Sequence, residues 1–188
     1  WAGADCGDPL FTKWFSMVDA PYSPDLNSWA VLTAFQNVVH SLEDAGRASG
    51  ALDSLKRLLY TAETSCYWYW TGQDVWDSQV TKAANAAVGK IASECGGMAD
   101  AQNWDKTGPT IFLPWVRPMN PGGLDWGNNC LVDAAKEATV RTLIYDVSGM
   151  EKVVLHYYVV GGHPQEMDMK DLGLYPCKTG AAVTSNMY

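Results

Sequence analysis

The sequence contains few charged residues, and positive charge is especially scarce. Asp and Glu number 21 among the 188 residues and Lys and Arg number 13, so the net charge at pH 7 is −8. Proteins that bind nucleic acid neutralise phosphates with Lys and Arg, and this chain has no excess of either. The composition therefore argues against a nucleic-acid partner. The low charge content, 18% of all residues, also argues against the Lys/Glu-rich surface of a typical hyperthermophile protein.

Long apolar runs and metal-ligand motifs are missing as well. No stretch approaches the roughly 18 apolar residues that a membrane-spanning helix needs, so we expect no membrane partner. The sequence has no CxxC pair, and its three histidines lie far apart. These spacings do not suit a zinc site, and Asp5 and Asp8 are too few carboxylates for a calcium site. We expect neither a bound metal nor a cofactor.

The cysteines bear on the compartment in which the protein works. Five cysteines in an acidic, Trp-rich chain fit a secreted, extracellular protein with two disulfides and one leftover thiol, and they equally fit buried free thiols. They are Cys6, Cys66, Cys95, Cys130 and Cys177. Pairs such as Cys66–Cys95 and Cys130–Cys177 would each lie within one half of the chain. The sequence does not fix the pairing.

Aromatic residues are abundant where charged ones are not. Nine Trp, nine Tyr and four Phe make up 12% of the chain. An indole ring offers a large flat apolar face and one N–H donor, and the C–H faces of sugars stack on such surfaces. Composition alone favours core packing as the role of these rings, with carbohydrate contact as the second interpretation.

The first half of the sequence has the pattern of a helical bundle. Apolar residues recur at spacings of three and four in three segments. The expected helices cover residues 24–46, 51–62 and 77–95. Asp25 is the expected cap of the first helix, Gly46 its end, and Gly96 and Gly97 stop the third. Three such stripes must bury one another, so residues 1–97 are expected to form a bundle of about three helices.

The pattern changes after residue 97. Residues 98–109 have little periodicity and are expected to be a linker. Beyond them, alternating and short apolar runs predict strands, with Pro114 interrupting the first. The expected strands cover residues 110–115, 138–147, 152–160 and 180–188. The predicted fold class is therefore α+β in two modules, the second being an antiparallel β-sandwich over residues 110–188.

The expected sandwich looks incomplete. An immunoglobulin-like sandwich has about seven strands in about 100 residues, and this region offers only about four. A bare edge strand would be a liability because it can pair with another chain. We therefore expect the 188 residues to be a portion of a longer polypeptide, or else to form a homo-oligomer through the open sheet edge.

The most distinctive segment lies between the second and third expected helices. Residues 67–70 are four consecutive aromatics, Tyr-Trp-Tyr-Trp, and a single helix face cannot bury all four. Glu63 precedes them and Asp74 follows them. Carboxylates beside ring faces are typical of a sugar-binding site, because the acids bind hydroxyl groups while the rings cover apolar faces. The other interpretation is an aromatic plug between the helices and the sheet.

This segment resembles a known family motif. The run AETSCYWYW at residues 62–70, followed by Trp76 and Asp77, is similar to the fifth motif of glycoside hydrolase family 57, most of all in its amylopullulanase-type members. The opening WAG with GDP at residues 7–9 resembles the segment just after the family's general acid. Family members often carry Asp where this chain has Cys66, which argues against direct sugar binding by that residue. The resemblance covers residues 1–95 well and the rest loosely.

The resemblance implies a role without catalysis. In the family, this motif lies in a helical bundle that follows an incomplete β/α barrel and leans over its active site, and a β-sandwich follows the bundle in amylopullulanase-type members. The barrel supplies the catalytic Glu and Asp, whose motifs are missing here, so this chain alone is expected to be inactive. The residues expected to position an α-glucan such as starch are Glu63, Tyr67, Trp68, Trp70, Asp74 and Trp76. The upstream barrel would be part of the same polypeptide.

Two other classes of function stay open at this point. One is an extracellular structural or assembly protein, in which the aromatics and the open sheet edge make subunit contacts. The other is a free-standing carbohydrate-binding module, which needs no catalytic acids. A parent chain of several hundred residues with an upstream acidic pair would favour the enzyme, and a native species of this size that polymerises would favour the assembly protein.

Overall fold

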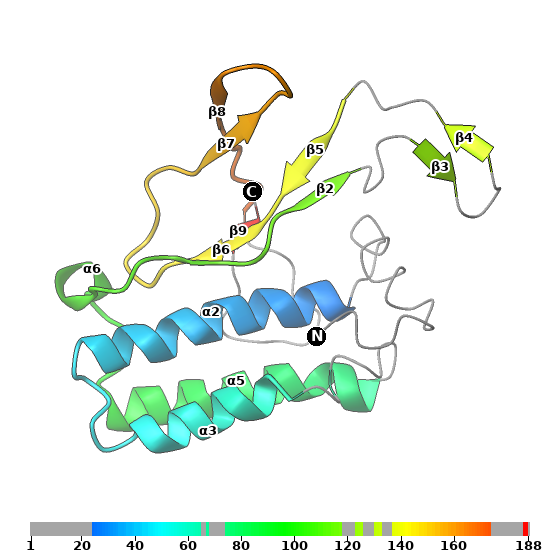
Figure 1. Cartoon of the computed structure of the whole chain (residues 1–188). Coiled ribbons are helices and arrows are strands. Elements are labelled where there is room, and N and C mark those ends of the chain that lie inside the picture. Colours follow the sequence, from blue (N-terminus) through cyan, green and yellow to red (C-terminus); the bar gives the residue numbers. More distant parts are fainter. Residues whose placement is uncertain are drawn as a thin grey trace.

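The computed structural model describes residues 24–64, 67, 74–117, 123–125, 130–132, 137–173 and 186–187 (Figure 1). Three long helices pack as a bundle and antiparallel strands lie on one side of it, so the predicted α+β class is confirmed. The helices are α2 (Pro24–Asp44), α3 (Leu52–Ala62), α5 (Asp74–Glu94) and the short α6 (Ala101–Trp104). None of the described helices has the length and apolar character needed to cross a membrane.

The three long helices pack along one another around a single apolar core. The residues predicted from the three-and-four spacing supply this core, and Leu42 of α2 and Leu55 of α3 are fully buried. On α5 the buried positions are mostly alanines, whose small side chains let neighbouring helices approach closely. They are Ala83, Ala84 and Ala87, together with Val80 and Ile91. The predicted helical bundle is therefore confirmed for the described residues.

The helix boundaries agree closely with the predicted ones, with one correction. Helix α2 begins at Pro24, so Asp25 is its second residue and not the cap before it. Proline is favoured at the first helical position because its fixed φ suits the helix and its missing N–H is not needed there. Helices α2 and α5 end just before Gly46 and Gly96, whose φ values of 68° and 74° lie in the left-handed region. Glycine adopts this conformation without steric cost, which explains both stops.

The strands of the second half form four small antiparallel sheets within the described residues, and not a clear sandwich. One sheet has three strands in the order β1–β6–β9, and the others are the pairs β2–β5, β3–β4 and β7–β8. The strands are β1 (Thr110–Ile111), β2 (Trp115–Arg117), β3 (Gly123–Asp125), β4 (Cys130–Val132), β5 (Thr139–Arg141), β6 (Leu143–Tyr145), β7 (Val154–Tyr158), β8 (Pro164–Asp168) and β9 (Asn186–Met187).

Strands β1 and β2 pair with β6 and β5 as two parts of one bent ribbon. Ile111 lies opposite Ile144, and Trp115 lies opposite Arg141. Three residues on one strand therefore face two on the other, which is the count of a β-bulge. Pro114 belongs to the longer side, where its missing N–H interrupts no regular ladder. The predicted interruption at Pro114 is confirmed.

The bulge places an aromatic side chain between the ribbon and the bundle. The Phe112 backbone N–H donates to the Leu143 carbonyl at 2.9 Å, and Thr142 Oγ1 donates to the Phe112 carbonyl at 2.6 Å. The Phe112 ring contacts the Trp29 ring of α2, with centroids 4.9 Å apart. This contact fixes one end of the ribbon on the helices.

A buried asparagine on α2 fixes the other end of the ribbon. Asn37 is fully buried. Its Nδ2 donates to the Gly108 carbonyl at 3.1 Å, and its Oδ1 accepts the Val147 backbone N–H at 3.0 Å. One amide therefore joins α2 to the chain just before β1 and just after β6.

The segment expected to be a linker is attached to the bundle. It contains α6, and the Arg47 guanidinium lies 4.7 Å from the centre of the Trp104 ring, a cation–π distance. The Trp104 indole N–H donates to the Ala99 carbonyl at 2.9 Å, and Thr107 Oγ1 donates to Asp44 Oδ2 at 2.7 Å. The contacts with Arg47 and Asp44 join residues distant in sequence, so local periodicity does not predict them.

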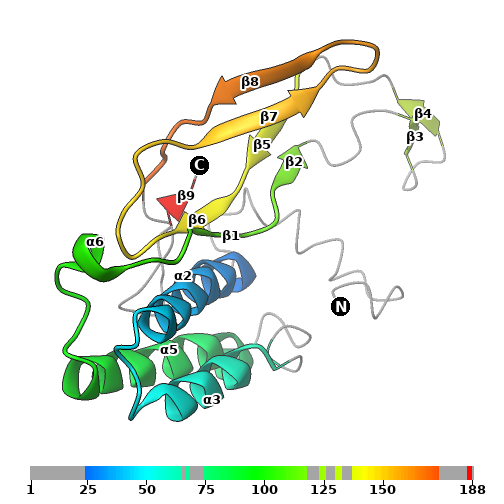
Figure 2. The same ribbon diagram turned by 60° about the vertical axis from the view of Figure 1, so that its left-hand side comes forward.

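The β7–β8 hairpin lies on the far side of β5 and β6 from the helices (Figure 2). The predicted strand over residues 152–160 is observed as β7, and it turns at Gly161 and Gly162 into β8. All of β8 is exposed. The predicted C-terminal strand is described only as β9, which forms one edge of the three-stranded sheet.

Candidate functional site

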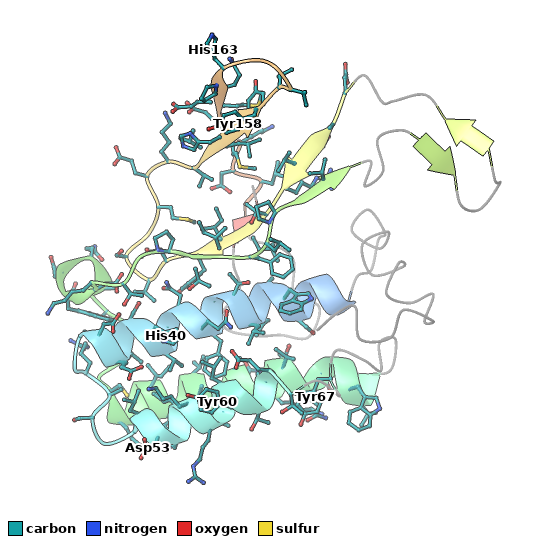
Figure 3. The ribbon with its side chains drawn as sticks, viewed as in Figure 1. His40, Asp53, Tyr60, Tyr67, Tyr158 and His163 are labelled. Atoms are coloured by element: carbon teal, nitrogen blue, oxygen red, sulfur yellow. The ribbon has the colours of Figure 1, made fainter. Side chains whose placement is uncertain are left out.

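Of the predicted sugar-binding residues, Tyr67 lies where the chain passes from α3 to α5, at one end of the bundle (Figure 3). Trp68 and Trp70 fall outside the described residues, and Asp74 is described only by its backbone, as the first residue of α5. The side chains that the structure describes are those of Glu63, Tyr67 and Trp76. Glu63 directly follows α3, Tyr67 lies between α3 and α5, and Trp76 is in the first turn of α5.

Tyr67 and Trp76 form an aromatic pair. Their ring centroids are 6.2 Å apart and their planes are inclined by 33°, within the range of favourable aromatic pairs. Both residues are half-buried, and Tyr67 packs against the edge of the bundle core. The Tyr67 N–H donates to the Thr64 carbonyl at 3.2 Å, which fixes the ring relative to the end of α3. The pair is therefore anchored on one side and accessible on the other, and it is not a plug sealed in the interior.

Glu63 occupies a position that helix electrostatics disfavours. It is the C-terminal cap of α3, and its backbone N–H donates to the Leu59 carbonyl at 3.0 Å. The C-terminal end of a helix carries partial negative charge, so a cation is favoured there and a carboxylate is not. No basic residue lies in the last turn of α3 to compensate. Helix stability therefore does not account for an acid here.

A residue that sequence reasoning missed orients this carboxylate. Gln36 of α2 donates from Nε2 to Glu63 Oε1 at 2.8 Å. Glu63 has no ion-pair partner among the described residues. The amide therefore holds one oxygen without neutralising the charge, and the second oxygen keeps its capacity to accept hydrogen bonds. Gln36 precedes Glu63 by 27 residues, and nothing in its local pattern marks it.

This arrangement suits the recognition of an uncharged ligand that has both hydroxyl groups and apolar faces. A carboxylate accepts hydroxyl protons, a side-chain amide both donates and accepts, and the ring pair covers an apolar face. The described part of the chain contains no group of three or more His, Cys, Asp or Glu side chains arranged to hold a metal ion.

Cys95, at the far end of α5, is a buried free thiol. The suggested Cys66–Cys95 pair is therefore not formed in this structure. Burial raises the pKa of the Cys95 thiol, and the neighbouring Glu94 carboxylate raises it further. A thiol with a raised pKa is a poor nucleophile, so Cys95 has a packing role. The side chains of the other four cysteines lie outside the described residues.

Comparison with known proteins finds no matching family model, no matching curated protein and no matching solved structure. The resemblance to glycoside hydrolase family 57 therefore stays a prediction from the sequence alone. Function has to be inferred from the site itself, since a fold class such as α+β serves many activities.

Proposed function

We propose that the end of the bundle binds an α-glucan chain, and that this protein is the non-catalytic portion of a glycoside hydrolase similar to family 57. The observation that carries the proposal is the Tyr67–Trp76 ring pair with the Glu63 carboxylate four residues before it, held by Gln36. The rings would cover the apolar face of a glucose unit. Glu63 and Gln36 would bond its hydroxyl groups, and Trp68, Trp70 and Asp74 belong to the same proposed site.

The role proposed for these residues is positioning. A retaining glycosidase cleaves its bond with two carboxyl groups about 5–5.5 Å apart, and the motifs that supply them in family 57 do not occur in this sequence. The catalytic acids would come from an upstream barrel of the same extracellular polypeptide. Holding the substrate in the correct orientation can supply a large part of the rate acceleration.

Calorimetric titration of the full chain with maltoheptaose tests this proposal. We expect the wild type to bind and Trp76→Ala to weaken binding about tenfold, because one good ring contact contributes roughly 1.5 kcal/mol. Glu63→Gln should also weaken binding, since it replaces a charged acceptor with a neutral group. Tyr158→Ala is the matched control, because this exposed ring lies on the remote β7–β8 hairpin. A folded wild type that binds no maltoheptaose would refute the proposal.

A second candidate, the assembly protein, is favoured by a different observation. The turn of the β7–β8 hairpin presents the apolar side chains of Tyr158, Val159 and Val160, all of them strongly exposed. Exposed apolar residues on an unpaired ribbon are typical of surfaces that contact another chain. Sedimentation velocity over a range of concentrations distinguishes the two candidates, because only the assembly protein should form larger species.

A further inference from the structure

Two side-chain contacts join α2 and α3 along their exposed side. Gln36 donates to Glu63 near one end, and Lys56 Nζ lies 2.6 Å from Glu43 Oε1 farther along. Glu43 follows Gln36 by seven residues and Lys56 precedes Glu63 by seven, so the two contacts fix one antiparallel register. Seven helical residues span about 10 Å.

Two further side chains lie between these contacts. His40 is on the same face of α2 as Gln36 and Glu43, at helical spacings of four and three, and Tyr60 has the corresponding position on α3. Figure 3 shows His40 and Tyr60 on these two adjacent helices. The His40 side chain is 53% exposed and Tyr60 is 59% exposed. We name the row formed by Gln36, His40, Glu43, Lys56, Tyr60 and Glu63 the α2–α3 seam.

The seam meets the proposed glucan site at one residue. Glu63 belongs to both, and Tyr60 precedes it by one helical turn, about 4.5 Å along the axis. An exposed Tyr offers an apolar face with a polar tip, as the Tyr67 ring does. Beyond Tyr60, the Glu43–Lys56 pair and His40 present both donors and acceptors of hydrogen bonds.

The charges of the seam favour an uncharged ligand. Lys56 is paired with Glu43, and the Glu63 carboxylate is bonded to a neutral amide. The row therefore has no uncompensated basic group to attract a phosphate or an acidic peptide. A polysaccharide presents hydroxyl groups and apolar ring faces at regular intervals. These match the alternation of aromatic and polar side chains along the seam.

We propose that a glucan held at the Tyr67–Trp76 pair continues along the α2–α3 seam, where Tyr60 stacks on a second sugar ring. His40, Glu43 and Lys56 then bond hydroxyl groups of the units beyond it. This inference depends on the proposed function, because the seam extends the same site. It makes the protein selective for long glucan chains over short ones.

The dependence of affinity on chain length tests the seam. Calorimetric titrations of the full chain compare maltotriose with maltoheptaose. We expect the wild type to bind maltoheptaose about tenfold more tightly, because the longer sugar reaches one further ring contact. Tyr60→Ala should lose this difference while keeping the wild-type affinity for maltotriose. Tyr60→Phe should retain it, because the ring face remains.

The outcomes separate the seam from the site on which it depends. If Tyr60→Ala keeps the full preference for maltoheptaose, or if the wild type shows no preference, the seam is refuted and the proposed function stands. If the wild type binds neither sugar, the seam and the proposed function are both refuted. Trp76→Ala should weaken binding of both sugars equally. Since Tyr60 is exposed, its replacement should leave the melting temperature close to that of the wild type, and circular dichroism checks this for each variant.

Discussion

The helices of the bundle and strand β7 of the β7–β8 hairpin are both rich in apolar residues but differ sharply in burial. In the bundle, the apolar stripe of each helix meets two others, and residues such as Leu42 and Leu55 are fully buried. In the hairpin, β7 pairs with β8 alone among the described strands, and every residue of β8 stays exposed. A regular pattern therefore predicts which face of an element is apolar, and packing depends on whether another element covers that face.

The two faces of the hairpin carry different kinds of side chain. The register places Leu155 opposite Met167 on one face and His156 opposite Glu166 on the other. His156 Nδ1 lies 3.3 Å from Glu166 Oε1, a cross-strand contact of modest strength between exposed groups. A two-stranded hairpin is marginally stable alone. We expect the hairpin to open more readily than the bundle.

The largest difference should come from matched leucine truncations. Leu55→Ala removes a fully buried side chain from the bundle and should lower the free energy of unfolding by about 2–5 kcal/mol. Leu155→Ala, on the half-buried hairpin face, should lower it by less than about 1 kcal/mol. Urea unfolding followed by circular dichroism measures both. Equal losses would show that the hairpin is as well packed as the bundle.

The second largest loss of stability should come from disrupting the contact between the helices and the strands. Asn37→Ala removes a fully buried amide and leaves the half-buried Val147 N–H without its partner, and a group that loses its hydrogen bond away from water costs about 1–3 kcal/mol. We expect a total loss of about 2–4 kcal/mol and faster hydrogen exchange at Val147. The exposed Asn103→Ala is the control. Unchanged exchange at Val147 would mean that Asn37 does not hold the ribbon on α2.

Low pH should weaken the same contact between helices and strands, because it protonates Asp105. Burial alone would raise the pKa of this carboxyl, but the Thr107 backbone N–H, which donates to Asp105 Oδ1 at 3.1 Å, and polar side chains nearby lower it below its ordinary value of 3.8. A lowered pKa in the folded state stabilises the fold above the ordinary value, and this stabilisation is lost as the pH falls through the lowered pKa.

The Asp105→Asn variant tests this pH dependence. It should be less stable than the wild type at neutral pH, and the difference should shrink as the pH falls below 3.8. Unfolding by urea at a series of pH values measures the difference, with the exposed Asp100→Asn as the matched substitution. A difference in stability that stays constant down to the lowest pH would contradict the lowered pKa of Asp105.

The smallest effect on stability should come from the tip of the hairpin. Val160 is fully exposed, so Val160→Ser should change the free energy of unfolding by no more than about 0.5 kcal/mol. If the hairpin binds a second copy of the chain, however, the same change should dissociate larger species in sedimentation velocity. If the wild type is monomeric at all concentrations, the tip of the hairpin does not bind a second copy of the chain.

The helices were predictable because their signals are local. The spacing of Leu42, Leu55 and their neighbours encodes each buried stripe within one segment, and Gly46 marks a stop. The short helix α6 was not predicted, because its cap Asp100 makes no side-chain hydrogen bond and its Trp104 is held by Arg47, far away in sequence. Strand β8 was missed because its sequence, PQEMD, lacks apolar alternation and it forms by pairing with β7.

The candidate site was predictable only where its residues lie close together in sequence. Glu63, Tyr67 and Trp76 lie close together in sequence, so one motif contains them all. Gln36 comes from another helix, and only the antiparallel packing of α2 on α3 brings it to Glu63. Tyr60 was passed over because helical periodicity identifies the apolar face of α3, whereas Tyr60 lies on the exposed face.

The most direct test of the account is hydrogen exchange of the full chain with and without maltoheptaose, resolved by peptide. We predict slower exchange in the presence of the sugar around residues 57–67 and in the first turns of α5, with the β7–β8 hairpin unchanged. Protection confined to the hairpin, or none anywhere at saturating sugar, would contradict the central claim that the end of the helical bundle binds a glucan.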